Sequence, residues 1–153
     1  YIKKICRNII STMKKIVSNI DEEIGYLYSQ LRYHNDCFEA DLLPKLKKSR
    51  PIFRIQNIKS SKFSTTEKGK YVMNDAAELF YKIERVYISA SFLGVKKKLP
   101  KKHVKDIKGL KQASINLMES MLGNMIKAVG KNQGKLLKSQ IFDNLEFLSK
   151  LDM

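Results

Sequence analysis

The residues that could carry out acid–base, nucleophilic or metal chemistry are few in this sequence. It has two histidines and two cysteines in 153 residues. Neither His34 nor His103 has companions at metal-ligand spacing, and no Glu-x-x-His pair indicates a di-metal bundle. A catalytic site formed by His34, Asp36 and Cys37 is the weaker alternative to a protein without catalytic function. We therefore expect a protein that is not an enzyme and that holds no metal or cofactor.

The segment from Gly130 to Lys135 has the glycines and lysine of a phosphate-binding loop but not their arrangement. The spacing between the glycines is one residue short, Leu136 stands where a hydroxyl residue should follow the lysine, and no strand precedes the segment. We reject a nucleotide-binding loop on these grounds.

Positive charge is the strongest chemical signal, because it is concentrated in two segments. The formal net charge is +15, and segments 44–64 and 94–111 carry +7 each. A lysine-rich composition without a function would spread its charge evenly. The clustering therefore favours anion binding over a merely solvated charge run.

Segment 94–111 is the main candidate for an anion site. Flexible ammonium groups at a helix start can each pair with a phosphate, and the free N–H groups of the new helix add a further anion site. Lysine without much arginine favours contact with the backbone of a nucleic acid over reading of its bases. The candidate residues are Lys96, Lys97, Lys98, Lys101, Lys102, Lys105 and Lys108.

Segment 44–64 is expected to form a second basic lobe, in which arginines make the more directional contacts. Its candidates are Lys45, Lys47, Lys48, Arg50 and Arg54. A third, weaker cluster comprises Lys127, Lys131, Lys135 and Lys138. Whether the three clusters share a face is left open by the sequence.

Apolar residues at three- and four-residue steps predict the helices that must position these lysines. Glycine and proline number only 7 and 3, too few for a turn-rich β fold. A long first helix is predicted over residues 2–43, with Pro44 as its end and a kink or short break at Gly25 or within residues 33–36. A second helix is predicted to begin with a Ser64–Glu67 capping box and to stop at Gly94.

Two more helices are predicted, over residues 104–129 and 135–151, with residues 130–134 as the turn between them. Met118, Met121 and Met125 fall at helical spacing in the third helix, and we expect them to fill the core. The predicted fold is a single all-α domain, a bundle of three to four amphipathic helices with a long first helix and two basic connectors.

The first helix has two further interpretations, because its apolar stripe is long enough to extend past a short bundle. Its polar side carries Lys3, Lys4, Lys14 and Lys15, followed by Asp21, Glu22 and Glu23. Its first twenty residues have the pattern of an interfacial membrane helix. Alternatively, the excess apolar length is covered by a second subunit in a homodimer.

The cysteines bear on the compartment. If one helix runs through Cys6 and Cys37, they lie tens of ångströms apart, too far for a disulfide. Reduced thiols in an intracellular setting are therefore favoured over secretion. The sequence begins at Tyr1, as a processed product or a trimmed fragment would, and it contains no apolar run long enough to span a bilayer.

These observations predict a non-catalytic protein that contacts a polyanion, with nucleic acid favoured, through lysine-rich loops. The alternative is a protein–protein interaction module, such as a secreted helical ligand, a pathogen factor or a complex subunit, that meets an acidic partner or an anionic membrane surface.

Overall fold

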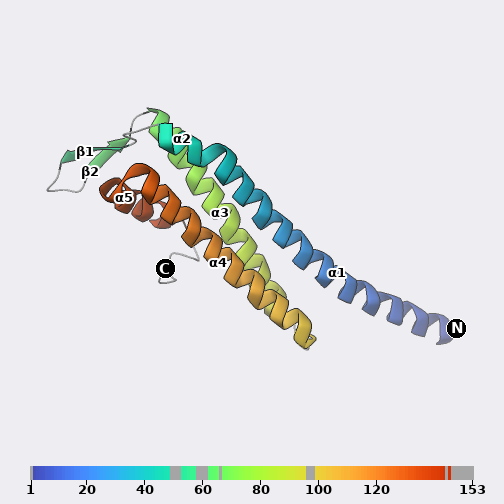
Figure 1. Cartoon of the computed structure of the whole chain (residues 1–153). Helices are drawn as coiled ribbons and strands as arrows, with labels where there is room; N and C mark the ends of the chain where they lie inside the picture. The colour runs from blue at the N-terminus through green and yellow to red at the C-terminus, as the bar shows by residue number, and fades with distance from the viewer. Residues whose placement is uncertain are drawn as a thin grey trace.

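The chain is an all-α bundle, as predicted. The computed structural model describes residues 2–48, 53–57, 62–65, 67–95, 99–143 and 145. Three long helices, α1 (Ile2–Cys37), α3 (Glu67–Val95) and α4 (Lys101–Val129), pack on one another, and consecutive ones run in opposite directions (Figure 1). The shorter α5 (Lys131–Asp143) folds back onto α4 and also contacts α3.

The first helix does not end at Pro44. A π-helical turn, η1 (Phe38–Leu42), joins α1 directly to α2 (Leu43–Lys48). Within this turn the N–H of Leu43 donates to the carbonyl of Phe38. Pro44 is the second residue of α2 and supplies no N–H to the helical hydrogen bonds, so the π turn lies directly before the residue that interrupts them. Gly25 and residues 33–36 lie within α1, so the expected break is replaced by the π turn that follows.

A small β-hairpin occupies the connector before α3. Its strands β1 (Phe53–Asn57) and β2 (Lys62–Thr65) pair antiparallel, with Phe53 opposite Thr65. Ser64 pairs with Arg54 inside this hairpin, and α3 begins only at Glu67. The prediction that Ser64 caps the second helix was therefore wrong, since strand pairing takes up its position.

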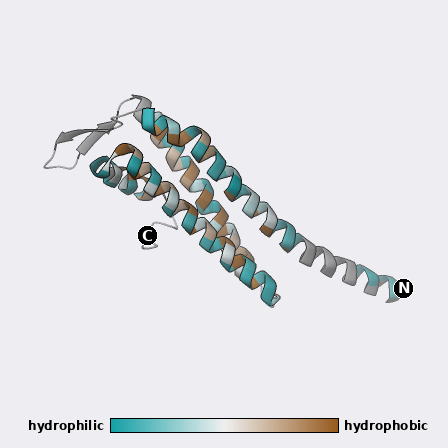
Figure 2. Cartoon of the chain, viewed as in Figure 1, coloured by the Kyte–Doolittle hydropathy of each residue, from teal (hydrophilic) through white to brown (hydrophobic). Residues whose placement is uncertain are grey.

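The core forms where one apolar stripe of each helix meets the others, and Figure 2 shows this division of hydropathy along the helices. Met118, Met121 and Met125 are buried, which confirms their expected role as core residues. Helix α3 buries an apolar stripe along its length, made of Val72, Ala76, Leu79, Phe80, Ile83, Val86, Tyr87 and Ala90.

The turns between helices are tighter than predicted. Gly94 belongs to α3, which runs to Val95, and a Cβ at Gly94 would lie 3.6 Å from Ile107 of α4. Gly130, at φ 92°, is the single residue between α4 and α5. Gly134 lies in α5, where its backbone approaches Ile126 so closely that a Cβ would come within 2.8 Å of that side chain.

This close approach makes Gly134 a packing residue, and the two glycines Gly134 and Gly123 should respond oppositely to alanine. Gly134→Ala should lower the free energy of unfolding by about 1 kcal/mol or more, because the added methyl overpacks the α4–α5 contact. Gly123→Ala should raise it by about 0.5–1 kcal/mol, because nothing lies within 4 Å of its Cβ position and alanine is the better helix former. Urea denaturation measures both, and equal effects would contradict the packing role.

His34 is buried on α1 beside α3. Burial, and to a lesser degree the charge of Lys82, hold the pKa of His34 below its ordinary value of 6.5. The unfolded chain therefore takes up a proton at this residue more readily than the folded chain does.

Folding stability should accordingly fall as the pH falls from neutral through 6.5, since protonation of His34 favours the unfolded state. A His34→Gln variant lacks this contribution, so its free energy of unfolding should decline less over the same range. Chemical denaturation at several pH values tests this, and parallel curves for the two proteins would contradict it.

Candidate functional site

Four of the predicted anion-binding lysines gather on the first two turns of α4. Lys101, Lys102, Lys105 and Lys108 are all exposed, and together we call them the α4 lysine face. Lys101, Lys105 and Lys108 follow at steps of four and three residues, so they line one side of the helix over about 10 Å. Part of the segment that was predicted as a basic connector is thus helical, and three of its lysines lie in a row along α4.

The position of this row is electrostatically unfavourable for the isolated protein. The first turn of α4 contains no acidic residue, and Pro100 supplies no side-chain hydrogen bond to the free N–H groups. Cations at a helix N-terminus oppose the helix dipole, and like charges four residues apart, such as Lys101 and Lys105, repel one another. A bound anion would relieve both effects and would also accept hydrogen bonds from the free N–H groups.

An interhelical hydrogen bond fixes the start of α4 against α1. Nε2 of His103 lies 2.8 Å from Oδ1 of Asp21, with the imidazole buried and the carboxylate half-exposed. Within the described part of the chain, His103 Nδ1 is buried without a hydrogen-bond partner. Sequence reasoning missed this contact because the two residues are 82 positions apart. The lysines on either side of His103 are thereby directed to solvent.

Lys111 marks the inner limit of the α4 lysine face. Its Nζ lies 5.2 Å from the ring centroid of Tyr87 on α3, and the side chain is half-buried. A cation over an aromatic ring contributes to packing between helices. This lysine therefore serves the α3–α4 contact, whereas the four before it face solvent.

The lysines of the first connector lie at the opposite end of the bundle (Figure 1). Lys45, Lys47 and Lys48 are exposed in the last turn of α2, and Lys45 pairs with Asp41 at 3.3 Å. Cations at a helix C-terminus stabilise the helix through its dipole. The helix dipole therefore accounts for the lysines of α2, whereas it does not account for those at the start of α4.

The remaining predicted site residues are distributed as follows. Arg54 has its backbone in β1, opposite Ser64. Lys96, Lys97, Lys98 and Arg50 lie outside the described residues.

The third cluster lies at the α4–α5 junction, at the same end as α2. Lys127, Lys131 and Lys135 are exposed, whereas Nζ of Lys138 lies 5.6 Å from the ring centroid of Phe142. Helix α2 contacts α4, so the first and third clusters lie at the same end of the bundle, opposite the α4 lysine face.

Two other kinds of functional element are absent from the described ranges. No three His, Cys, Asp or Glu side chains there are placed to hold a metal ion. No helix there is both long enough and apolar enough to cross a membrane. Comparisons with protein-family models, curated proteins and solved structures each gave no match. Function is therefore inferred from the geometry of the chain itself.

The unfavourable charge at the start of α4 predicts a stabilising substitution. Lys101→Glu should raise the free energy of unfolding by about 0.5–1.5 kcal/mol, because the new carboxylate favours the helix N-terminus and pairs with Lys105 four residues later. Lys47→Glu, at the C-terminus of α2, is the matched control and should lower it. Thermal denaturation at low salt measures both, and a loss of stability in Lys101→Glu would contradict the assignment.

Proposed function

We propose that this chain is a non-enzymatic protein that binds a polyanion, namely a nucleic acid, through the α4 lysine face. The observation that supports this most directly is the group of four exposed lysines on the first two turns of α4, whose first turn has no acidic residue and whose N-cap residue Pro100 makes no side-chain hydrogen bond. This arrangement costs folding stability in the absence of an anion, so a bound anion offers a physical reason for it.

Binding would be electrostatic and insensitive to base sequence. Each lysine that neutralises a phosphate releases a condensed counterion, so affinity falls steeply with salt. Lysine ammonium groups bind phosphate as point charges and lack the planar bidentate geometry that reads guanine. The expected ligand contact is therefore the sugar–phosphate backbone.

Replacing Lys101, Lys102, Lys105 and Lys108 with glutamine should weaken binding at least about tenfold at moderate salt. The slope of log affinity against log salt concentration should fall by up to about 3.6 for duplex DNA, because four phosphate contacts are lost. Fluorescence anisotropy with labelled single- and double-stranded oligonucleotides across a salt series measures both quantities.

The matched control replaces Lys45, Lys47, Lys48 and Lys127 with glutamine. This variant loses the same formal charge at the opposite end of the bundle, so it separates a local site from net charge. Its affinity should stay within about threefold of the original, since nonspecific long-range attraction is largely screened. Equal losses in the two variants would show that net charge alone drives binding.

A protein–protein interaction module is the second candidate. It is favoured by an open groove between α1 and α3 that exposes Tyr26, Tyr33 and Phe92. Exposed aromatic side chains around a groove are typical of a surface that receives another polypeptide.

A further inference from the structure

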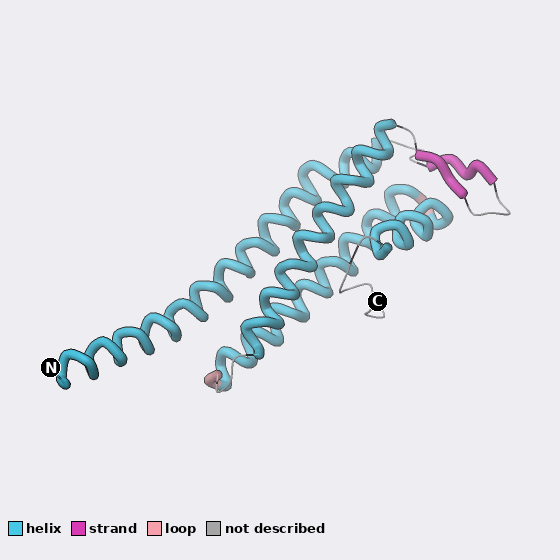
Figure 3. Tube along the Cα trace, turned by 180° about the vertical axis from the view of Figure 1, so that it is seen from behind, coloured by secondary structure: helices cyan, strands magenta, loops and turns pink. Residues whose placement is uncertain are grey.

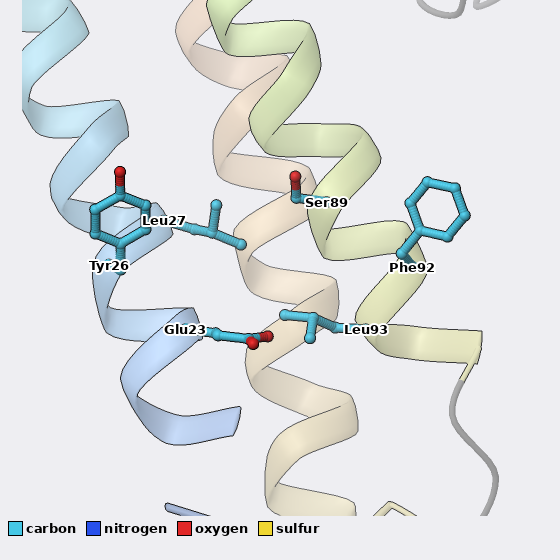
Figure 4. A pocket seen from close by; sticks show the side chains of 6 residues that line it. All are labelled: Glu23, Tyr26, Leu27, Ser89, Phe92 and Leu93. Atoms are coloured by element: carbon cyan, nitrogen blue, oxygen red, sulfur yellow. The ribbon is translucent and has the colours of Figure 1, made fainter. Parts of the chain in front are cut away.

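Three adjoining cavities form one groove along the outer side of α1 and α3, which we call the α1–α3 groove. The cavities share Tyr26, Leu27 and Ser89 at one junction and Lys82 at the other. The largest has a volume of about 410 Å³. Figure 4 shows the cavity nearest the α3–α4 turn, with Tyr26 and Leu27 on one helix and Phe92 and Leu93 on the other.

Aromatic residues line this groove, and acids gather toward the hairpin end. Tyr26, Tyr33 and Phe92 are 63%, 64% and 71% exposed, although each sits beside buried core residues. At the hairpin end the lining includes Asp41, Asp75 and Glu78, which are exposed. Along α1 and η1 the groove extends from Glu23 to Asp41, a length of about 27 Å.

The N-terminal part of α1 extends past the bundle. Ile20 is the first residue of α1 that the structure describes as buried, and Figures 1 and 3 show the helix continuing beyond the α3–α4 turn. We call residues 2–19 the N-terminal projection; as a helix it is about 26 Å long. Ile2 and Ile5 are 76% and 44% exposed, at the start of an apolar pattern that runs in phase with Ile20 and Ile24.

Charge divides this helix into two halves of opposite sign. The N-terminal projection contains five basic residues and no acid, a net charge of +5. Residues 20–42 contain six acids and a single basic residue, Arg32, a net charge of −5. The groove lining itself holds four acids, Glu23, Asp41, Asp75 and Glu78, against two basic residues, Lys82 and Arg85, so it carries a net charge of −2. One chain thus carries both a basic helix with an apolar stripe and an aromatic groove of net negative charge and similar length.

We propose that a second copy of this chain occupies the groove: the N-terminal projection of each copy lies antiparallel in the α1–α3 groove of the other. A two-fold axis makes this exchange reciprocal, so each copy gives one helix and receives one. An amphipathic helix in an apolar groove is a common recognition mode, and opposite charges fix its direction.

The length match defines a register. In this register Ile2 of one copy lies opposite Asp41 of the other. Because the two helices are antiparallel, residue numbers rise along one helix as they fall along the other. Arg7 then lies opposite Asp36, and Lys3 opposite Ala40, between Glu39 and Asp41. The same register brings Cys6 of the projection opposite Cys37, a free, half-buried cysteine that lines the groove.

The cysteines provide a direct test, because within one chain they lie on a single unbroken helix about 46 Å apart. A short bismaleimide should therefore link the native chain into covalent dimers between copies. Cys6→Ser and Cys37→Ser should each lose the product, because equivalent cysteines of two antiparallel copies remain far apart. An equimolar mixture of the two variants should recover it, since one supplies Cys6 and the other Cys37.

Two outcomes of this experiment would overturn the proposal. One is that the native chain stays monomeric by light scattering at the highest concentration reached. The other is that either single-cysteine variant cross-links as efficiently as the native chain, which would indicate another arrangement or random collision.

Charge reversal tests the same contact without relying on thiols. Changing Lys3, Lys4 and Arg7 to glutamate, or changing Asp41, Asp75 and Glu78 to lysine, should raise the dimer dissociation constant about a hundredfold or more, because like charges then face one another. All six positions are exposed, so the fold should persist, and circular dichroism checks this. The chain that combines both sets should dimerise again, as sedimentation equilibrium would show.

If the chain that combines both sets of substitutions does not dimerise again, the proposed pairing of the N-terminal projection with the α1–α3 groove is overturned. Binding to phosphatidylserine-containing vesicles tests the other possible occupant of the apolar face of the N-terminal projection, which is an anionic lipid surface. A native chain that binds these vesicles through Lys3, Lys4 and Arg7 but remains monomeric in their absence would assign the N-terminal projection to an anionic lipid surface and overturn the dimer.

Discussion

Burial of one apolar stripe from each of α1, α3 and α4 against the other two is the constraint on which the rest of the structure depends. It fixes which side of each helix faces inward, and therefore which lysines remain in water. It also fixes the antiparallel order of the helices, which carries the two basic connectors to opposite ends of the bundle. The Asp21–His103 hydrogen bond then holds the start of α4 against α1 at one of these ends.

Helix polarity gives the same residue type opposite consequences at the two ends. Lysines at the C-terminus of α2 lie where the helix dipole is negative, and they need no ligand to account for them. Lysines at the N-terminus of α4 lie where the dipole is positive and the backbone N–H groups are uncapped. This contrast, and not the total charge, is the reason why we propose the α4 lysine face as the anion site.

The unequal length of the helices connects the two proposals. Ile20 is the first residue of α1 that the structure describes as buried, and the helix extends about 26 Å further toward its N-terminus, past the turn where the α4 lysine face begins. An antiparallel exchange of N-terminal projections would place the α3–α4 ends of both copies near the two-fold axis. Two lysine faces would then present one larger basic surface, on which a single polyanion could neutralise the repulsion between copies.

The sequence by itself determined the helical class, the core stripes and the clustering of positive charge, because each depends on local spacing that a short segment carries alone. It misplaced the helix end at Pro44 and the helix start at Ser64, where the local signal was overridden by a π turn and by a strand pairing respectively. The stop predicted at Gly94 lies one residue from the observed end of α3 at Val95.

Only the tertiary structure decided which lysines share a face, that His103 meets Asp21, and that aromatic and acidic side chains of α1 and α3 line one groove. These features join residues far apart in the chain, and their distances are set by how whole helices pack. Local spacing carries no information about such distances.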